Sequence, residues 1–280
     1  MTYGPTVLNT QSITVSADTR ASSGKWGEAN WVLANDGELI FLGGDIDTQA
    51  NLYQSLREAN VDPAAVKSIE FTTKTSANNI SRAFVDLPEL QKVLKLGNLN
   101  YSGSAESMFL SAANLEEIDL DGFDTSKITT MEYMFLGIKA STLDVSKFDT
   151  SNVTNMRGMF DGASNLTSLD LSSFDTSKVV DMSYLFVGLS KITELDVSSF
   201  NTSNVTNMRG MFDGVSNITS LDLSNFDTTK ANDMNYMFLG AEKLEQLDIS
   251  SFNTASVKSM KNMFSSMKAL EKLDLFFYYF

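Results

Sequence analysis

Aspartate recurs at one position of a repeating unit, and this series of carboxylates is the feature of the sequence best suited to bind a ligand. Each aspartate lies between two aliphatic residues, and serine follows two positions later in most units. Side chains alternate along a strand, so aliphatic residues that face a core leave the aspartates and serines facing solvent. The candidate ligand-binding residues are Asp119, Asp144, Asp170, Asp196, Asp222, Asp248, Ser146, Ser172, Ser198, Ser224 and Ser250, with Asp274 at the end of the series.

Two interpretations of this carboxylate column stay open. Two unit charges about 5 Å apart repel by roughly 0.8 kcal/mol in water, and by more near a protein surface. In the first interpretation the column is hydrated, accepts hydrogen bonds from the serines and nearby lysines, and has somewhat raised pKa values. In the second it binds divalent cations, with calcium as the candidate, or a cationic ligand such as a basic peptide. No other cofactor is predicted.

An arginine pair and a second acidic series complete the set of polar candidates. Arg157 and Arg209 occupy matching positions two units apart and are included among the candidate ligand-binding residues, although a pair of solvated charges is the simpler interpretation. The second series alternates aspartate with asparagine before a threonine, which is typical of turns, and Thr150 or Ser151 is placed to cap a following helix. Its members are Asp124, Asp149, Asp175, Asn201, Asp227 and Asn253.

The composition excludes several kinds of site and partner. The 280 residues contain neither cysteine nor histidine, which removes disulfides, zinc-thiolate sites and the usual general base of a serine or cysteine nucleophile. A formal net charge of −14 argues against nucleic acid and anionic membrane surfaces. No stretch approaches the ~18 apolar residues of a membrane span, and the amino terminus lacks a signal-peptide pattern. A uniform column offers no distinct pair of catalytic groups, so we predict that the protein is not an enzyme.

The elements that position these residues follow from a period of 26 residues. Residues 151–174 recur at 203–226 with three differences, and a looser copy lies between them, so two units were duplicated together. Each unit has an LxxLDL segment typical of a strand, then apolar residues such as Met156 and Phe160 at helical spacing. One unit cannot bury its own apolar residues. The sequence therefore predicts an α/β repeat solenoid, a leucine-rich-repeat-like right-handed stack of 25–26-residue units with a short parallel sheet.

A small amino-terminal cap of a hairpin plus a helix is predicted before the repeats. Alternating apolar segments flank residues 35–37, Asn-Asp-Gly, which is a strong hairpin signal. A helix capped by Asp47 or Thr48 follows, and Pro63 is expected to end it. The predicted domains are a Ser/Thr-rich linker or strand over 1–24, the cap over 25–65 and the solenoid over 66–280, with degenerate units over 66–114, clear units over 115–275 and an aromatic end over 276–280.

The repeats resemble a known family. The units LTSLDLSSFDTSKVVDMSYLF and ITSLDLSNFDTTKANDMNYMF look like those of BspA-like leucine-rich-repeat surface proteins of bacteria, and SGKWGEANWVLANDGELIF resembles the hairpin that often precedes such repeats. The resemblance implies a secreted or cell-wall-attached protein whose signal and anchor are not in this chain. It also implies binding to host extracellular matrix, mucus or cell-surface protein or glycoprotein, and it supplies no catalytic residues.

Three functions are therefore carried forward as hypotheses. The first is a non-enzymatic adhesion module that uses the acidic, hydroxyl-rich face of the repeat sheet. The second is a structural spacer that holds another domain away from the cell wall. The third is an inhibitor that uses the acidic face against a cationic host protein, with binding that collapses at high salt. No direct membrane insertion is expected, and the five aromatic residues over 276–280, if uncovered, favour self-association.

Overall fold

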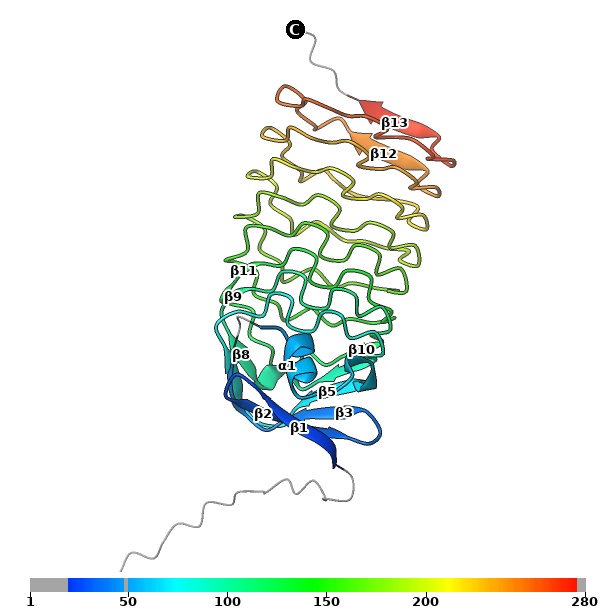
Figure 1. Cartoon of the computed structure of the whole chain (residues 1–280). Coiled ribbons are helices and arrows are strands. Elements are labelled where there is room, and N and C mark those ends of the chain that lie inside the picture. Colours follow the sequence, from blue (N-terminus) through cyan, green and yellow to red (C-terminus); the bar gives the residue numbers. More distant parts are fainter. Residues whose placement is uncertain (1–19, 48–49, 276–280) are drawn as a thin grey trace, which may run out of the picture.

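The computed structural model describes residues 20–47 and 50–275, which form a stack of coils with a hairpin and a helix at its amino-terminal end (Figure 1). Successive coils lie on one another in sequence order, so the two ends of the described chain lie at opposite ends of the stack. The parallel solenoid predicted from the 26-residue period is confirmed. The aromatic end over 276–280 lies outside the described residues, as do residues 1–19.

A six-stranded sheet joins the hairpin to the first coils. The hairpin predicted around residues 35–37 is present, with Trp31 opposite Phe41 across antiparallel strands. The sheet then continues in parallel with one strand from each of the next coils. The strands, in their order across the sheet, are β1 (Arg20–Trp26), β2 (Ala29–Ala34), β3 (Glu38–Phe41), β5 (Ser68–Phe71), β7 (Lys92–Leu94) and β10 (Glu117–Ile118).

The single α-helix of the described residues, α1 (Leu52–Glu58), begins later than predicted. Its N-cap is Asn51, whose side chain accepts a hydrogen bond from the backbone N–H of Gln54, so the cap predicted at Asp47 or Thr48 is wrong. Pro63 does not end this helix, which stops at Glu58, but opens the short 3₁₀ helix η2 (Pro63–Ala65). A second 3₁₀ turn, η3 (Leu96–Asn98), follows β7.

The opposite side of the stack carries shorter strands. In the first coils, β4 (Gly44–Ile46), β6 (Thr75–Ala77) and β8 (Leu99–Tyr101) form one parallel sheet, and β9 (Gly103–Ser104) pairs with β11 (Ile128–Thr130). Further along, single parallel bridges join the residue that corresponds to Thr130 in successive coils, from Asn155 to Ser259. Figure 1 shows β9 and β11 on one side of the stack and β10 on the other.

The segment that carries the methionines and phenylalanines is not helical, which corrects the prediction. Its backbone N–H groups donate alternately to the next coil, as Met156 N does to Asp181 O at 3.0 Å, and Phe160 N does to Leu185 O at 3.1 Å. Between these bonds the chain makes successive tight turns. We call residues 155–163 and their equivalents the turn segment. The turn segment buries Met156, Met159, Phe160 and Ala163, a spacing close to that of a helix. Its backbone hydrogen bonds, however, go mainly to the neighbouring coils.

The leucine side of each coil is less regularly bonded than predicted. Strands pair there at the first coils and again at β12 (Gln246–Ile249) and β13 (Lys272–Leu275). Residues 142–146, 168–172, 194–198 and 220–224 make no backbone hydrogen bonds to one another between coils. Packing of the buried aliphatic residues therefore holds the middle of this side together, with scattered bonds such as those from Thr167 N to Ser141 O at 3.1 Å and from Ser199 Oγ to Leu171 O at 3.1 Å.

Columns of identical side chains fill the core. The phenylalanines within the turn segments, Phe160 and its equivalents, stack along the solenoid. The ring centroids of Phe160 and Phe186 lie 6.1 Å apart with an interplanar angle of 3°. The methionines of the middle coils are fully buried beside them, so the prediction that they are core residues is confirmed there. Because every coil lends one face to the next, the apolar surface is buried jointly.

Candidate functional site

The aspartates and serines of the column lie along the leucine side, and we call this surface the Asp–Ser face. It comprises Asp119, Asp144, Asp170, Asp196, Asp222, Asp248 and Asp274 with Ser146, Ser172, Ser198, Ser224 and Ser250. Asp170 Oδ1 accepts hydrogen bonds from the backbone N–H of Ser172 at 3.0 Å and from its hydroxyl at 2.6 Å. The same aspartate-to-serine backbone bond recurs in every coil from Asp144 to Asp248. Each serine thus fixes the orientation of one carboxylate.

The pKa values of the five carboxylates from Asp144 to Asp248 are lowered, so the predicted raised values are wrong there. The Ser146 and Ser172 hydroxyls hold the pKa values of Asp144 and Asp170 below the usual range, and at Asp170 the charges of Asp144 and Asp196 oppose this with a smaller effect. For Asp222 the backbone N–H of Ser224 has the largest effect on the pKa, again downward. Local hydrogen bonds to the charged form outweigh repulsion between coils, since the carboxylates are exposed to water. These five carboxylates are therefore ionised at neutral pH.

Lysines form ion pairs near the two ends of the Asp–Ser face but not in its middle. Lys147 pairs at 2.8 Å with Asp121, which takes the serine position two residues after Asp119, and Lys272 pairs with Asp274 at 2.7 Å. Among the described residues, no lysine or arginine forms an ion pair with Asp170, Asp196 or Asp222. An open hollow adjoins this region, lined by Glu116, Glu117, Ile118, Thr142, Leu143, Asp144, Ser168 and Asp170. The middle of the face thus presents uncompensated negative charge.

The calcium hypothesis finds no preformed cage. Within residues 20–47 and 50–275, no three acidic side chains come together in a way that could hold a metal ion. Calcium needs six to eight oxygen ligands, which a single row of carboxylates does not supply. The Asp–Ser face is better suited to a ligand that spreads its positive charges along several coils.

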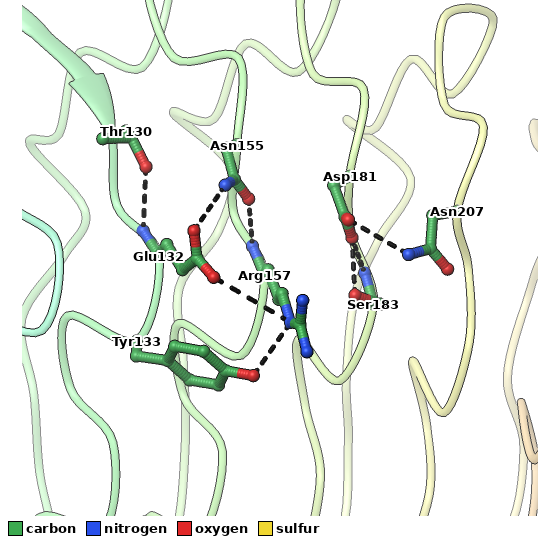
Figure 2. Close-up of polar contacts among 8 residues, drawn as sticks. All are labelled: Thr130, Glu132, Tyr133, Asn155, Arg157, Asp181, Ser183 and Asn207. Carbon is green, nitrogen blue, oxygen red and sulfur yellow. Dashed lines mark hydrogen bonds and ion pairs between the residues drawn. The ribbon is translucent and has the colours of Figure 1, made fainter.

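The two arginines do not belong to this face but to a ladder on the turn side. Arg157 Nε donates to the hydroxyl of Tyr133 at 2.8 Å (Figure 2). Its guanidinium lies 5.6 and 5.7 Å from the ring centres of Tyr133 and Tyr184. Arg209 likewise donates to Tyr184 and lies 4.8 Å from the ring centre of Tyr236. We call Tyr133, Arg157, Tyr184, Arg209 and Tyr236 the Tyr–Arg ladder.

Acidic groups compensate the ladder's charges. Glu132 lies 3.9 Å from Arg157 Nε and accepts a hydrogen bond from the side chain of Asn155 at 2.8 Å. Asp233 lies 3.5 Å from Arg209. With stacking, hydrogen bonds and a carboxylate close by, each guanidinium already has partners. The interpretation of a solvated pair is therefore wrong, and the arginines hold coils together.

Glycine makes room for the ladder in alternate coils. A Cβ on Gly158 would lie 2.2 Å from the Tyr133 ring, and one on Gly210 would lie 2.8 Å from the Tyr184 ring. Both glycines also have left-handed φ angles, +55° and +58°. This alternation has the same two-unit period as the duplicated sequence. The signal was present in the sequence as Arg-Gly in one unit and a tyrosine in the next.

Comparison with known proteins identifies a family. The sequence profile described as "Mycoplasma protein of unknown function, DUF285" matches residues 103–194 and 188–275, which is more than half of the chain. The chain belongs to the DUF285 family. No curated protein sequence matches this DUF285 chain significantly.

Two solved structures are similar to the DUF285 chain at low scores. A leucine-rich repeat protein from Eubacterium ventriosum ATCC 27560 is 14% identical with a TM-score of 0.35, over 92% of this chain and 84% of the other. A leucine rich cell surface protein from Faecalibacterium prausnitzii A2-165 is 14% identical with a TM-score of 0.26, over 92% and 96%. Similarity this weak carries no inference about function. In the described part of the DUF285 chain, no helix is long and apolar enough to cross a membrane.

The second acidic series of the DUF285 chain forms turns, as predicted, but its threonines do not cap helices. Asp149 Oδ1 accepts a hydrogen bond from Ser151 N at 3.0 Å. The buried Thr176 hydroxyl donates to Asn201 O at 3.0 Å and accepts from Asn201 N at 2.8 Å, which ties one coil to the next. These threonines satisfy backbone groups that would otherwise be buried without partners.

Two acidic residues of the turn side were missed in the sequence. Asp161 and Asp213 follow the core phenylalanine in alternate coils, and their carboxylates have no hydrogen-bond donor among the described residues. Burial raises the pKa of Asp161 to about 6, with the charge of Asp213 adding to the effect. Burial also raises the pKa of Asp213. Their positions in the other coils are taken by Leu136, Val187 and Leu239, and that substitution of acid for aliphatic residues was the available signal.

Proposed function

We propose that this DUF285 chain is a non-enzymatic binding module that recognises a cationic protein or glycoprotein surface through the Asp–Ser face. The observation that carries the proposal is the middle of that face, where Asp170, Asp196 and Asp222 are exposed, held in fixed orientations and without ion-pair partners among the described residues. A fixed charge that already has its hydrogen bonds loses little side-chain entropy when a cation approaches.

Repetition suits such a face to extended partners. Each exposed ion pair contributes about 0.2–1 kcal/mol, so a single contact binds weakly. Several contacts on one rigid stack act together, because the second and later contacts form within one complex. The expected ligand is therefore long or multivalent, with positive charges spaced along its length, and its binding is weakened by salt.

The proposal includes a location outside the cell and a role without catalysis. The BspA-like character of the repeats supports a secreted or wall-attached adhesin that meets host matrix, mucus or other cells. The uniform Asp–Ser face supports a non-enzymatic role, because all its resolved pKa values between Asp144 and Asp248 are lowered in the same direction and none is set apart as an acid.

Binding of the full chain to immobilised mucin, fibronectin and a lysine-rich peptide tests this function. We expect the wild type to bind at least one of the three, and the Asp170→Asn/Asp196→Asn/Asp222→Asn variant to bind about tenfold more weakly. The matched control is Asp86→Asn/Glu89→Gln/Glu106→Gln, which changes the net charge equally at exposed acids outside the face. Equal losses of affinity in both variants would show that only the net charge matters, and would reject the Asp–Ser face as the binding site.

A structural spacer is the second candidate, and a different observation supports it. The turn segments are joined by backbone hydrogen bonds from coil to coil, and the phenylalanine rings stack along the same line. Such a stack makes a stiff rod that can hold another domain at a distance. A spacer predicts no binding to any of the three surfaces by either variant or by the wild type.

A further inference from the structure

The backbone hydrogen bonds between turn segments run in one direction. The residue just before each segment donates the other way, as Val180 N does to Thr154 O at 2.8 Å. In the coil that contains Phe160, the N–H groups of residues 156, 158, 160 and 162 donate to carbonyls of the following coil, at 2.8–3.1 Å. Its carbonyls at 155, 157, 159 and 161 accept from the preceding coil. The same arrangement recurs through the coil that contains Phe238. Each turn segment therefore has one edge of donors and one edge of acceptors, unlike an ordinary strand, whose edge alternates the two.

The acceptor edge at the amino-terminal end is contacted by the helix. The backbone N–H of Leu52, the first residue of α1, donates to Ala83 O at 3.2 Å. A helix N-terminus carries free N–H groups and a partial positive charge. The cap thus supplies a donor to the end that presents carbonyls, and Figure 1 shows α1 against the first coils.

The donor edge at the other end has no such cover among the described residues. In the last coil, the N–H groups of Met260, Asn262, Phe264 and Ser266 occupy the donor positions and meet no acceptor there. We call these four groups the donor edge. Apolar surface lies beside it, because Met260 is 47% exposed and the Phe264 ring, which stacks on Phe238 at 6.2 Å, is only partly buried.

The charge of this coil also differs from that of the chain. Residues 255–275 contain four lysines and two acidic residues, whereas the whole chain carries −14. Lys268 pairs with Glu242 and Lys272 with Asp274, which leaves Lys258 and Lys261, on either side of Met260, without an ion pair among the described residues. Aligned N–H groups add partial positive charge to the same edge, as in other concave arrays of backbone amides. The end of the stack is therefore a cationic, donor-rich and partly apolar surface on an acidic molecule.

We propose that the donor edge is a docking site for an acidic polypeptide segment that presents a row of backbone carbonyls and folds onto it as a further coil. The interface would repeat the one already made between neighbouring turn segments, with N–H donors, a phenylalanine face and methionine contacts. Main-chain hydrogen bonds would supply affinity and the apolar residues specificity, as when a peptide adds to a sheet edge.

A second copy of this chain does not provide the complementary surface. Two donor edges facing each other place N–H groups against N–H groups, which leaves both rows unsatisfied. The acceptor edge of another copy is contacted by α1. The donor edge therefore does not pair with itself, and the partner must carry a free row of carbonyls.

Amide hydrogen exchange of the full chain tests the proposal directly. The probe is a synthetic peptide of residues 203–228, whose carbonyls at 207, 209, 211 and 213 accept such bonds in the native stack. Without peptide we expect the four donor-edge amides to exchange at least about a hundredfold faster than those of Met234, Tyr236 and Phe238. With peptide they become protected, and a scrambled peptide of the same composition has no effect.

Two variants locate the binding, and several outcomes overturn it. Met260→Arg should weaken peptide affinity about tenfold, whereas Val180→Arg, at an apolar residue 44% exposed in a middle coil, should not. Slow donor-edge exchange that rises when residues 276–280 are removed would make that tail the occupant and reject the proposal. Protection that grows with protein concentration would make a second copy the occupant and reject it as well, as would an absence of protection by the peptide.

Discussion

The two long sides of each coil are joined to their neighbours by different forces. On the turn side, hydrogen bonds run from coil to coil, and the ladder and the buried threonines add side-chain bonds. On the leucine side, the middle coils are joined mainly by packing and a few side-chain bonds, such as Ser199 Oγ to Leu171 O at 3.1 Å, with no backbone bonds between residues 168–172 and 194–198. The side that carries the exposed aspartates is thus the one whose spacing is less constrained. We expect the turn side to set the stability of the stack and the leucine side to adapt to a ligand.

The largest expected effect comes from a methyl group on the turn side. Gly158→Ala places a Cβ 2.2 Å from the Tyr133 ring at a φ of +55°, so steric overlap and left-handed strain should together cost about 3 kcal/mol of unfolding free energy. Gly137→Ala is the matched control, since its φ is +67° but nothing lies within 4 Å, and it should cost about 1–2 kcal/mol. Urea unfolding measures both, and equal losses would show that the ladder imposes no steric demand.

The next effect tests a buried hydrogen bond against an exposed one. Thr176→Val keeps the side-chain shape but leaves Asn201 N and O without their partner, so it should cost about 2 kcal/mol. Ser172→Ala removes a bond to Asp170 at the exposed surface and should change stability by less than about 0.5 kcal/mol. Comparable losses in the two variants would contradict the division between the sides.

Asp161, on the turn side, should make the folded protein less stable as the pH rises, whereas Asp170 on the Asp–Ser face should make it less stable as the pH falls. The Asp161 carboxyl has a pKa of about 6 in the folded chain against an ordinary 3.8, so its contribution to stability is complete below 3.8 and is lost as pH rises through 6. Asp161→Asn removes that loss. At pH 8 the variant should be more stable by about 1 kcal/mol, after allowance for solvent screening of a half-buried group, with no difference below pH 3.8. Melting curves across this range measure the effect.

The smallest expected effect on stability is at the Asp–Ser face, and its dependence on pH is the reverse of that of Asp161. The pKa of Asp170 is lowered by Ser172, so the stability it contributes is present above 3.8 and is lost as pH falls through its folded pKa. Asp170→Asn should therefore melt slightly below the wild type at pH 7, and the difference should shrink under acid conditions. A variant that melts higher at pH 7 would show that repulsion along the column dominates after all.

The sequence predicted what depends on period and burial. The coil length, the hairpin at residues 35–37 and the core positions of Met156 and Phe160 all follow from apolar residues at regular spacing. A helix and the turn segment bury residues at almost the same spacing, so periodicity could not separate them. Gly158 within the expected helix was the contrary signal, because glycine is unfavourable there.

The sequence predicted which aspartates and serines line the candidate site, but not the direction of their pKa shifts. The Asp–Ser column follows from alternation along the chain. The sign of the pKa shifts does not, because it depends on whether Ser172 lies within reach of Asp170 and how far water screens the neighbouring aspartates. Arg157 was included among the candidate ligand-binding residues because it matches Arg209 two units away, and only the fold shows that it lies on the other side, against Tyr133.

The fit of tyrosine over glycine limits how such a gene can change in length. Deleting one unit, such as residues 151–176, would bring the coil of Tyr133 against that of Tyr184, and a tyrosine would replace the glycine on which the ring rests. Deleting residues 151–202 would instead bring Tyr133 onto Gly210 and restore the fit. We therefore expect the fold to tolerate the loss or gain of repeats in steps of two units. The size of one tyrosine ring sets that step.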